Sequence, residues 1–345
     1  MTTMRQIVFR RLLVSRLAIT ALGMALTAVA SIQSVEAKII TFDPAGSIRT
    51  EPMSINADGA ITGWYEDSKD TFHSFVRAAD GTITNFDVKG DKCGSGGTDA
   101  SSINRGGVIT GEYQDADCVD HGFVRAASGK ITTFSVRRAI STGGASINDG
   151  SVVTGSYGDK NNFYHGFVRA TDGTVTSFDP KGSIGTAPYG INKKGVIAGT
   201  YVDSGDVYHG FVRAKDGSIT IFDPPGSEDT FADSINDSGA IVGEYVNEGA
   251  YYGFLRSADG HYTTIDPPGS TATFASSIDD DGVITGGWDN ISGQHGFVRA
   301  ANGTYTSFDP KGSTGTTPAA INGKGVITGS YDDTNGQQHG FLRTP

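Results

Sequence analysis

A five-residue segment, His-Gly-Phe-Val-Arg or a close variant of it, recurs at a nearly constant interval along this 345-residue chain. The copies begin at residues 73, 121, 165, 209, 252, 295 and 339, so the steps are 48, 44, 44, 43, 43 and 44 residues. A repeat of this length is one supersecondary unit that cannot bury its apolar faces alone, and the copies must therefore pack on one another.

The first 37 residues lie outside the repeat and have the layout of a secretory signal peptide. Four arginines precede an apolar run at residues 17–30, which is too short to span a membrane comfortably, and small-residue cleavage signals follow it. A retained N-terminal anchor is the alternative. We therefore expect a signal peptide (1–37) and one domain (38–345) in a secreted protein, periplasmic or extracellular, with no stable membrane span.

The mature chain is strongly acidic. Removing residues 1–37 takes away four Arg and one Glu, which leaves 23 basic and 37 acidic side chains and changes the formal net charge from -11 to -14. Proteins that bind nucleic acid neutralise phosphates with Lys and Arg, so this surface disfavours such a partner.

Each repeat contains four short segments with the composition of β-strands. In one copy they are residues 189–192, 195–201, 208–214 and 218–223, rich in Ile, Val, Thr, Phe and Tyr and bounded by turn residues. Asn-x-x-Gly separates the first two segments, and Asp-Gly or a similar pair separates the last two, as in tight antiparallel turns. The sequence therefore predicts an all-β, seven-bladed β-propeller with four antiparallel strands in each blade.

The two ends of the repeat array are complementary. A fourth-strand segment at Ile39–Asp43 precedes the first full repeat, and the chain ends on a third strand at His339–Thr344. Pairing of these two segments would complete the last blade and close the ring without an exposed sheet edge. A solenoid would need polar capping repeats, and an outer-membrane barrel would need longer strands with a lipid-facing apolar band, so both alternatives are weaker.

The repeat resembles the HAF-type extracellular repeat of bacterial secreted proteins. The resemblance rests on the pattern Ile-Asn-x-x-Gly-x-Ile-x-Gly-x-Tyr followed by His-Gly-Phe-Val, and it covers nearly the whole mature chain. Gly here replaces the Ala of that family, and Phe-Asp-Pro replaces an apolar Leu-Gly segment. The resemblance supports the propeller-like fold and implies no particular activity.

We expect any ligand to bind on the face that carries the long, variable connections, since the other face carries only tight turns. Two cysteines, Cys93 and Cys118, fall in neighbouring connections of this face. In an exported chain they predict a disulfide that contributes about 3–4 kcal/mol if it is unstrained. Two free thiols, or one nucleophilic thiol, are the alternative.

Two polar positions recur in every repeat or nearly so, and we expect both to be structural. Symmetry spreads the histidines around the ring, so they cannot converge on one metal ion, and no metal site is predicted. The arginines would fasten neighbouring blades by bonding the carbonyls of the Asn turns. These positions are His73, His121, His165, His209, His295 and His339, and Arg77, Arg125, Arg169, Arg213, Arg256, Arg299 and Arg343.

Aromatic residues at the ends of the second strands are the candidate ligand-binding side chains. They are Tyr65, Tyr113, Tyr157, Tyr201, Tyr245, Trp288 and Tyr331. Such rings can stack on sugars, and packing between blades is the alternative. An Asp ends most of the fourth strands, where an Asx turn or a shallow calcium site would use it.

No catalytic motif is present: neither a nucleophile elbow, a zinc-protease motif nor a phosphate-binding glycine loop occurs. The sequence thus favours a secreted, non-catalytic binding module for a carbohydrate or a protein, without a required cofactor. An extracellular glycan-active hydrolase or lyase is the alternative, and it would need an unmatched pair of carboxylates in a pocket.

Overall fold

The structure is a computed structural model that describes residues 37–90 and 96–345. These residues form 28 β-strands and no helix. The first fourteen are β1 (Lys38–Phe42), β2 (Ser47–Ile55), β3 (Ile61–Asp67), β4 (Phe72–Arg77), β5 (Ile83–Phe86), β6 (Thr98–Ile103), β7 (Ile109–Gln114), β8 (Asp120–Arg125), β9 (Ile131–Phe134), β10 (Ser141–Ile147), β11 (Val153–Gly158), β12 (Tyr164–Arg169), β13 (Val175–Phe178) and β14 (Ser183–Ile191). The others are β15 (Ile197–Asp203), β16 (Tyr208–Arg213), β17 (Ile219–Phe222), β18 (Asp229–Ile235), β19 (Ile241–Asn247), β20 (Ala250–Arg256), β21 (Tyr262–Ile265), β22 (Ala272–Ile278), β23 (Ile284–Asn290), β24 (Gly293–Arg299), β25 (Tyr305–Phe308), β26 (Ser313–Ile321), β27 (Ile327–Asp333) and β28 (Gln338–Thr344).

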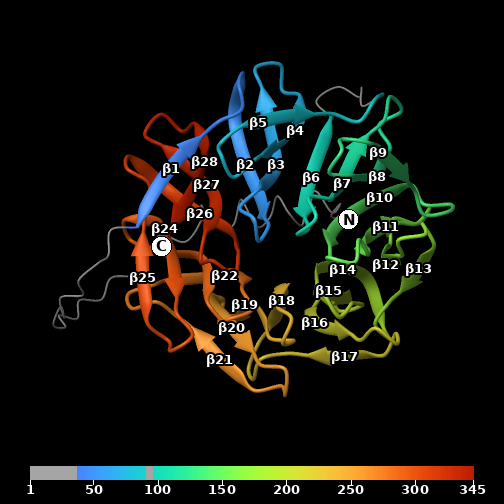
Figure 1. The fold of residues 1–345 in the computed structure, drawn as a ribbon. Coiled ribbons are helices and arrows are strands. Elements are labelled where there is room, and N and C mark those ends of the chain that lie inside the picture. The colour runs from blue at the N-terminus through green and yellow to red at the C-terminus, as the bar shows by residue number, and fades with distance from the viewer. Residues whose placement is uncertain (1–36, 91–95) are drawn as a thin grey trace.

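Antiparallel pairing groups the strands into meanders of four, as the turns predicted. The units are β2–β5, β6–β9, β10–β13, β14–β17, β18–β21 and β22–β25, and β26–β28 with β1. Single parallel bridges, such as Tyr164 with Gly185, join some neighbours. The hydrogen-bonded sheets therefore have 12, 8, 4 and 4 strands rather than four strands each. Figure 1 shows the units side by side around a common centre.

The first and last strands of the described chain pair with each other. β1 lies antiparallel to β28, with Ile39 opposite Arg343 and Phe42 opposite Gly340. The predicted partners are therefore the observed ones, and Figure 1 shows β1 beside β28. The first strand of each unit also contacts that of the next, and β26 contacts β2.

The apolar core lies between neighbouring units. The Ile, or Val153 in β11, that begins the second strand and the Phe of the third strand are fully buried, as Ile197 and Phe211 are at 0% exposure. A Phe from the fourth strand of one unit packs edge-on against the Phe of the next, and Phe42 on β1 meets Phe75 on β4 in this way at 6.0 Å between ring centroids. Since each unit buries its faces on two neighbours, no unit has a core of its own.

A β-bulge interrupts the first strand of every unit, opposite a glycine of the second. In β14 the register shifts between Pro188 and Gly190, which leaves Tyr189 as the extra residue. A Cβ on the facing Gly199 would lie 2.4 Å from the carbonyl oxygen of Ala187, so only glycine fits there. The bulge changes the direction of one side chain in each unit. These residues are Met53, Ser101, Ala145, Tyr189, Asp233, Ser276 and Ala319.

Hydrogen bonds between the Asn turns connect neighbouring units at the tight-turn face. In each turn, Asn Oδ1 accepts backbone N–H groups of its own turn, while Nδ2 donates to the backbone oxygen of the corresponding residue in the next turn. The donors are Asn56, Asn104, Asn148, Asn192, Asn236 and Asn322, with distances of 2.9–3.2 Å. Asn322 donates to Asn56, which links the last turn to the first. We call these six residues and Asp279, which holds the remaining position, the Asn ring.

Two sequence predictions fall largely outside the described residues. The predicted signal peptide, 1–37, overlaps them only at residue 37. Cys93 lies within 91–95, so the predicted pairing of Cys93 with Cys118 stays a prediction. Cys118 is at the tip of the β7–β8 connection and has φ 63°. None of the described residues belongs to a helix that could cross a membrane.

Candidate functional site

The face opposite the Asn ring carries the connections of variable length, and three positions on the strands differ from unit to unit. They are the bulge residue, the residue two places before it on the first strand, and the residue that precedes the histidine on the third strand. The first strand of one unit lies against the second and third strands of its neighbour. These positions therefore meet at the junctions between units, where departures from the repeat can form a site.

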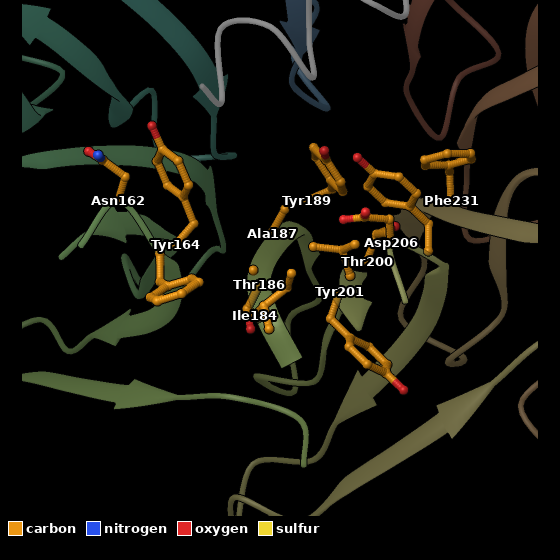
Figure 2. A pocket seen from close by; sticks show the side chains of 14 residues that line it. Asn162, Tyr164, Ile184, Thr186, Ala187, Tyr189, Thr200, Tyr201, Asp206 and Phe231 are labelled. Carbon is orange, nitrogen blue, oxygen red and sulfur yellow. The ribbon is translucent and has the colours of Figure 1, made fainter. Parts of the chain in front are cut away.

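An aromatic pocket lies at this face, where the units β10–β13, β14–β17 and β18–β21 meet. It has a volume of about 270 Å3. Its aromatic lining consists of Phe163, Tyr164, Tyr189, Tyr201, Tyr208 and Phe231. Figure 2 shows Tyr189 and Phe231 on one side of the pocket and Tyr164 with Asn162 on the other.

A small side chain on β14 explains why the pocket forms at this junction. The position two before the bulge is Phe231 on β18 and Phe274 on β22, but it is Ala187 on β14; Gly143 on β10 is also small, but the residue before the histidine of its preceding unit is Asp120 rather than a tyrosine. Phe231 and Phe274 each meet a tyrosine from the preceding unit, Tyr208 at 5.0 Å and Tyr251 at 5.5 Å between ring centroids. Ala187 leaves that space open beside Tyr164, and the resulting cavity is walled by rings that other junctions use for packing.

Asp206 carries the only charged side chain among the residues that line the aromatic pocket. It occupies the tight turn between β15 and β16 with φ 62°, a left-handed conformation that Asp tolerates better than most residues. The carboxylate of Asp203 holds this turn by accepting the N–H groups of Gly205 and Val207, and these bonds lower its pKa. Figure 2 draws Asp206 next to Tyr189 and Thr200.

The aromatic residues predicted as sugar platforms mostly pack inside the protein. Tyr65, Tyr201, Tyr245 and Tyr331 are buried, and Tyr113, Tyr157 and Trp288 are partly buried. Each ring lies against the third-strand residue beside it, a histidine in six units and Tyr252 in the seventh, at 5.0–5.6 Å between ring centroids. This burial favours the packing alternative. Only Tyr201 of this set lines the aromatic pocket, and Figure 2 shows its ring directed away from Tyr189.

The repeated histidines link strands within their own units. In five of the six units, Nδ1 bonds the Asp that ends the fourth strand, at 2.7–2.9 Å, as His209 bonds Asp223; His121 bonds Ser135 instead. Nε2 faces the connection between the second and third strands, where His121 bonds Asp115 at 2.8 Å. His339 bonds Asp43 and so ties β28 to the segment after β1. These contacts hold the third strand to the end of the fourth strand in the same unit.

The repeated arginines bridge neighbouring units, but through aromatic rings rather than through the carbonyls of the Asn turns. The guanidinium of Arg213 lies 4.9 Å from the ring centre of Phe178, which belongs to the preceding unit. Arg77, Arg125, Arg169, Arg256 and Arg343 lie over the corresponding Phe at 4.7–5.0 Å. Arg299 instead faces Tyr305 at 5.9 Å, since Ile265 replaces that Phe. Cation–π attraction thus fastens the units.

Burial raises the pKa of three described carboxyl groups, Glu51, Asp279 and Asp289, and all three lie outside the aromatic pocket. Burial raises the pKa of Glu51, and Arg49, Ser330 and Gln338 offset part of this effect by charge and hydrogen bonds. Burial also raises the pKa of Asp289 to about 6, against a small opposing effect of His295. Within residues 37–90 and 96–345, no group of three or more His, Cys, Asp or Glu side chains is arranged to hold a metal ion.

The predicted aromatic platforms contribute only Tyr201 to the aromatic pocket. Tyr189 and Phe231 were not among the candidate residues. Tyr189 was missed because the pattern of alternating residues does not reveal which residue is bulged. The available signal was the combination of the small Ala187 with the aromatic residues Tyr164 and Tyr189, which no other repeat has at the corresponding positions.

No protein-family model and no curated protein sequence matches this chain. The resemblance to the HAF-type repeat therefore stays a prediction. Solved structures do match. The chain is similar to a streptogramin B lyase with a TM-score of 0.60 and 13% sequence identity, over 90% of this chain and 98% of that one.

Two further structures show the same similarity. One is a catalytically inactive virginiamycin B lyase from Staphylococcus aureus with quinupristin, with a TM-score of 0.62 and 13% identity over 90% of this chain and 100% of that chain. The other is a prolyl endopeptidase, with a TM-score of 0.62 and 9% identity over 86% of this chain and 48% of that chain. Identity this low shows the fold alone: the chain has a propeller-like, all-β repeat fold.

Proposed function

We propose that the four-strand units are the seven blades of a closed β-propeller in a secreted protein. Two observations support closure: β1 completes the unit of β26–β28 by pairing with β28, and Asn322 donates a hydrogen bond to Asn56. Both interactions join residues close to the two ends of the described chain. A closed ring leaves no first or last blade with an open face, and it presents one rigid surface of connections on which a ligand can bind.

The protein acts as a non-catalytic binding module whose ligand site is the aromatic pocket. The observation that carries this proposal is the combination of aromatic rings with a single carboxylate around a cavity of about 270 Å3. Small-ligand sites are concave, mostly apolar and provided with a few polar groups. A sugar ring fits this chemistry, because its C–H faces stack on aromatic rings and its hydroxyl groups bond nearby polar atoms.

Hydrolysis or elimination of a glycan is the second candidate. It is motivated by the raised pKa values of Glu51 and Asp289, which are typical of carboxyl groups that act as general acids. Glycoside hydrolysis needs two carboxyl groups that flank one bond. The aromatic pocket offers only Asp206, so binding without turnover is the better supported function.

The test uses the purified mature protein on a glycan array, with product analysis of each retained glycan. Tyr208→Ala should abolish retention, because it removes one wall of the aromatic pocket. Tyr251→Ala is the matched control: Tyr251 makes the same ring contact in the next unit but does not line the pocket. Retention that survives Tyr208→Ala would refute the assignment of the site, and a glycan product would favour the enzyme.

A further inference from the structure

We propose that the aromatic pocket selects a ligand that carries a positively charged amine or ammonium group. This inference rests on the proposed function and adds the chemical class of the ligand. Its basis is the arrangement of Tyr164, Tyr189, Tyr208 and Phe231 with the carboxylate of Asp206 around one cavity.

The rings of the pocket would attract a cation. An organic cation is attracted to the face of an aromatic ring, and several rings around one cavity reinforce this attraction because each contributes its quadrupole. Tyr208 and Phe231 already meet at 5.0 Å with 36° between their planes, so they form a fixed corner rather than two independent rings. Tyr189 is directed out of the sheet pairing by the bulge in β14. A preformed corner costs little ordering when a ligand binds.

The charged groups around the pocket also favour a cation. Asp206 is the only charged lining residue, and no Lys, Arg or His lines the cavity. Two further carboxylates lie on the same elements: Asp203 holds the turn, and Asp229 accepts the N–H of Tyr208 at 2.9 Å. His209, which follows Tyr208 in the chain, faces Asp203 and Asp223. Such surroundings favour a cation and disfavour a phosphate or carboxylate.

The size of the pocket limits the ligand. Its volume of about 270 Å3 is just below the range of about 300–1,000 Å3 that is common for drug-sized ligands. One amino sugar residue or one small alkylammonium group is of suitable size. The first would come from a glycan with free amino groups, and the second from a quaternary ammonium compound. Both share the charge that Asp206 and the rings recognise.

The experiment compares oligomers that carry free, charged amines with oligomers in which those amines are acetylated and uncharged, by calorimetry with the full mature protein. Chitosan oligomers, which carry free amines, should bind at least tenfold more tightly than their N-acetylated counterparts, and the difference should shrink as salt is added. If tetramethylammonium competes with chitosan, the site recognises an ammonium group without a sugar. If chitosan binds and tetramethylammonium does not compete, the site recognises an amino sugar.

The variants separate charge from shape. Asp206→Asn should weaken chitosan binding about tenfold while the melting temperature stays unchanged. Asp70→Asn is the matched control, since Asp70 occupies the same turn position in the first unit with φ 59° and lies outside the pocket. Equal affinity for the charged and acetylated oligomers, or an unchanged affinity in Asp206→Asn, would overturn this inference but leave a binding pocket. Failure of Tyr208→Ala to affect any ligand would overturn the proposed function itself.

Discussion

One position of the Asn ring lacks a hydrogen-bond donor, and a donor introduced there should stabilise the protein. Six members of the ring donate an Nδ2–H to a backbone oxygen of the next turn. Asp279 occupies the remaining position, and its Oδ1 accepts the N–H groups of Asp281 and Val283, as Asn Oδ1 does in the other turns. A carboxylate has no hydrogen to donate, so the bond to the oxygen of Asn322 is missing.

The substitution Asp279→Asn changes one oxygen to an NH2 group without a change of shape. Asp279 is 6% exposed, and burial raises the pKa of its carboxyl group although the two N–H groups oppose this effect. The substitution adds a buried hydrogen bond, worth about 1 kcal/mol, and removes the cost of burying a charge. We expect the free energy of unfolding at pH 7 to rise by about 1–2 kcal/mol, which corresponds to about 2–4 °C in Tm.

The dependence on pH distinguishes this explanation from a general effect of removing charge. A carboxyl group whose pKa is raised by folding binds protons more tightly in the folded state, so it destabilises the protein above that pKa and stops doing so as the pH falls through it. The advantage of Asp279→Asn over the wild type should therefore be largest near neutral pH and decrease as the pH approaches 4. Thermal melting of both proteins from pH 4 to pH 8 measures this.

Asn192→Asp is the reciprocal control. It removes the donor to the oxygen of Asn236, a bond of 3.0 Å, and should lower the free energy of unfolding by about 1–3 kcal/mol at pH 7. If Asp279→Asn leaves Tm unchanged or lowers it while Asn192→Asp is destabilising, the view that Asp279 is a missing donor in an otherwise continuous ring is refuted.

Two further predictions concern the repeat itself. Gly199→Ala should destabilise the protein by about 1–3 kcal/mol in denaturant titration, since its Cβ would lie 2.4 Å from the oxygen of Ala187. Gly323→Ala is the control and should change the stability little, because its Cβ meets nothing within 4 Å. Similar values for the two variants would contradict the view that the bulge requires a glycine opposite it. His73→Gln should remove a pH-dependent contribution to the free energy of unfolding. Burial lowers the pKa of His73, but Asp87 and Asp67 outweigh this effect and leave the pKa raised. The stabilisation is therefore complete below about pH 6.5 and is lost as the pH rises through the folded-state pKa. A difference in Tm between wild type and variant that does not vary from pH 5 to pH 8 would contradict this.

In most units, the glycine that precedes Phe in the repeated segment lies close to the fourth-strand Phe of its own unit. A Cβ on Gly210 would lie 2.5 Å from the ring of Phe222, and the same conflict recurs at Gly122, Gly166 and Gly296 with the Phe of their own fourth strands. In these four units the Gly leaves room for that Phe, whereas Ser74 faces Phe86 in the first unit and Gly253 faces Ile265 in the fifth.

The sequence by itself determined the number of repeats, the four strands in each and the turns between them, because these depend on periodicity and on residues with strong local preferences. It also predicted the partner of the first strand, since the array begins with a fourth strand and ends with a third. For the repeated histidines the sequence predicted a structural role but not the partners, which the structure shows in the bonds between His209 and Asp223 and between His339 and Asp43.

Only the tertiary structure decided which aromatic residues line a cavity. The tyrosines at the ends of the second strands have equivalent sequence positions, and stacking on histidine buries most of them. Tyr189, Ala187 and Phe231 contribute to one pocket because a bulge turns one side chain out and a small residue leaves space beside large ones from two other units. Such a cavity depends on the volumes that neighbouring units bring together, and no single repeat contains that information.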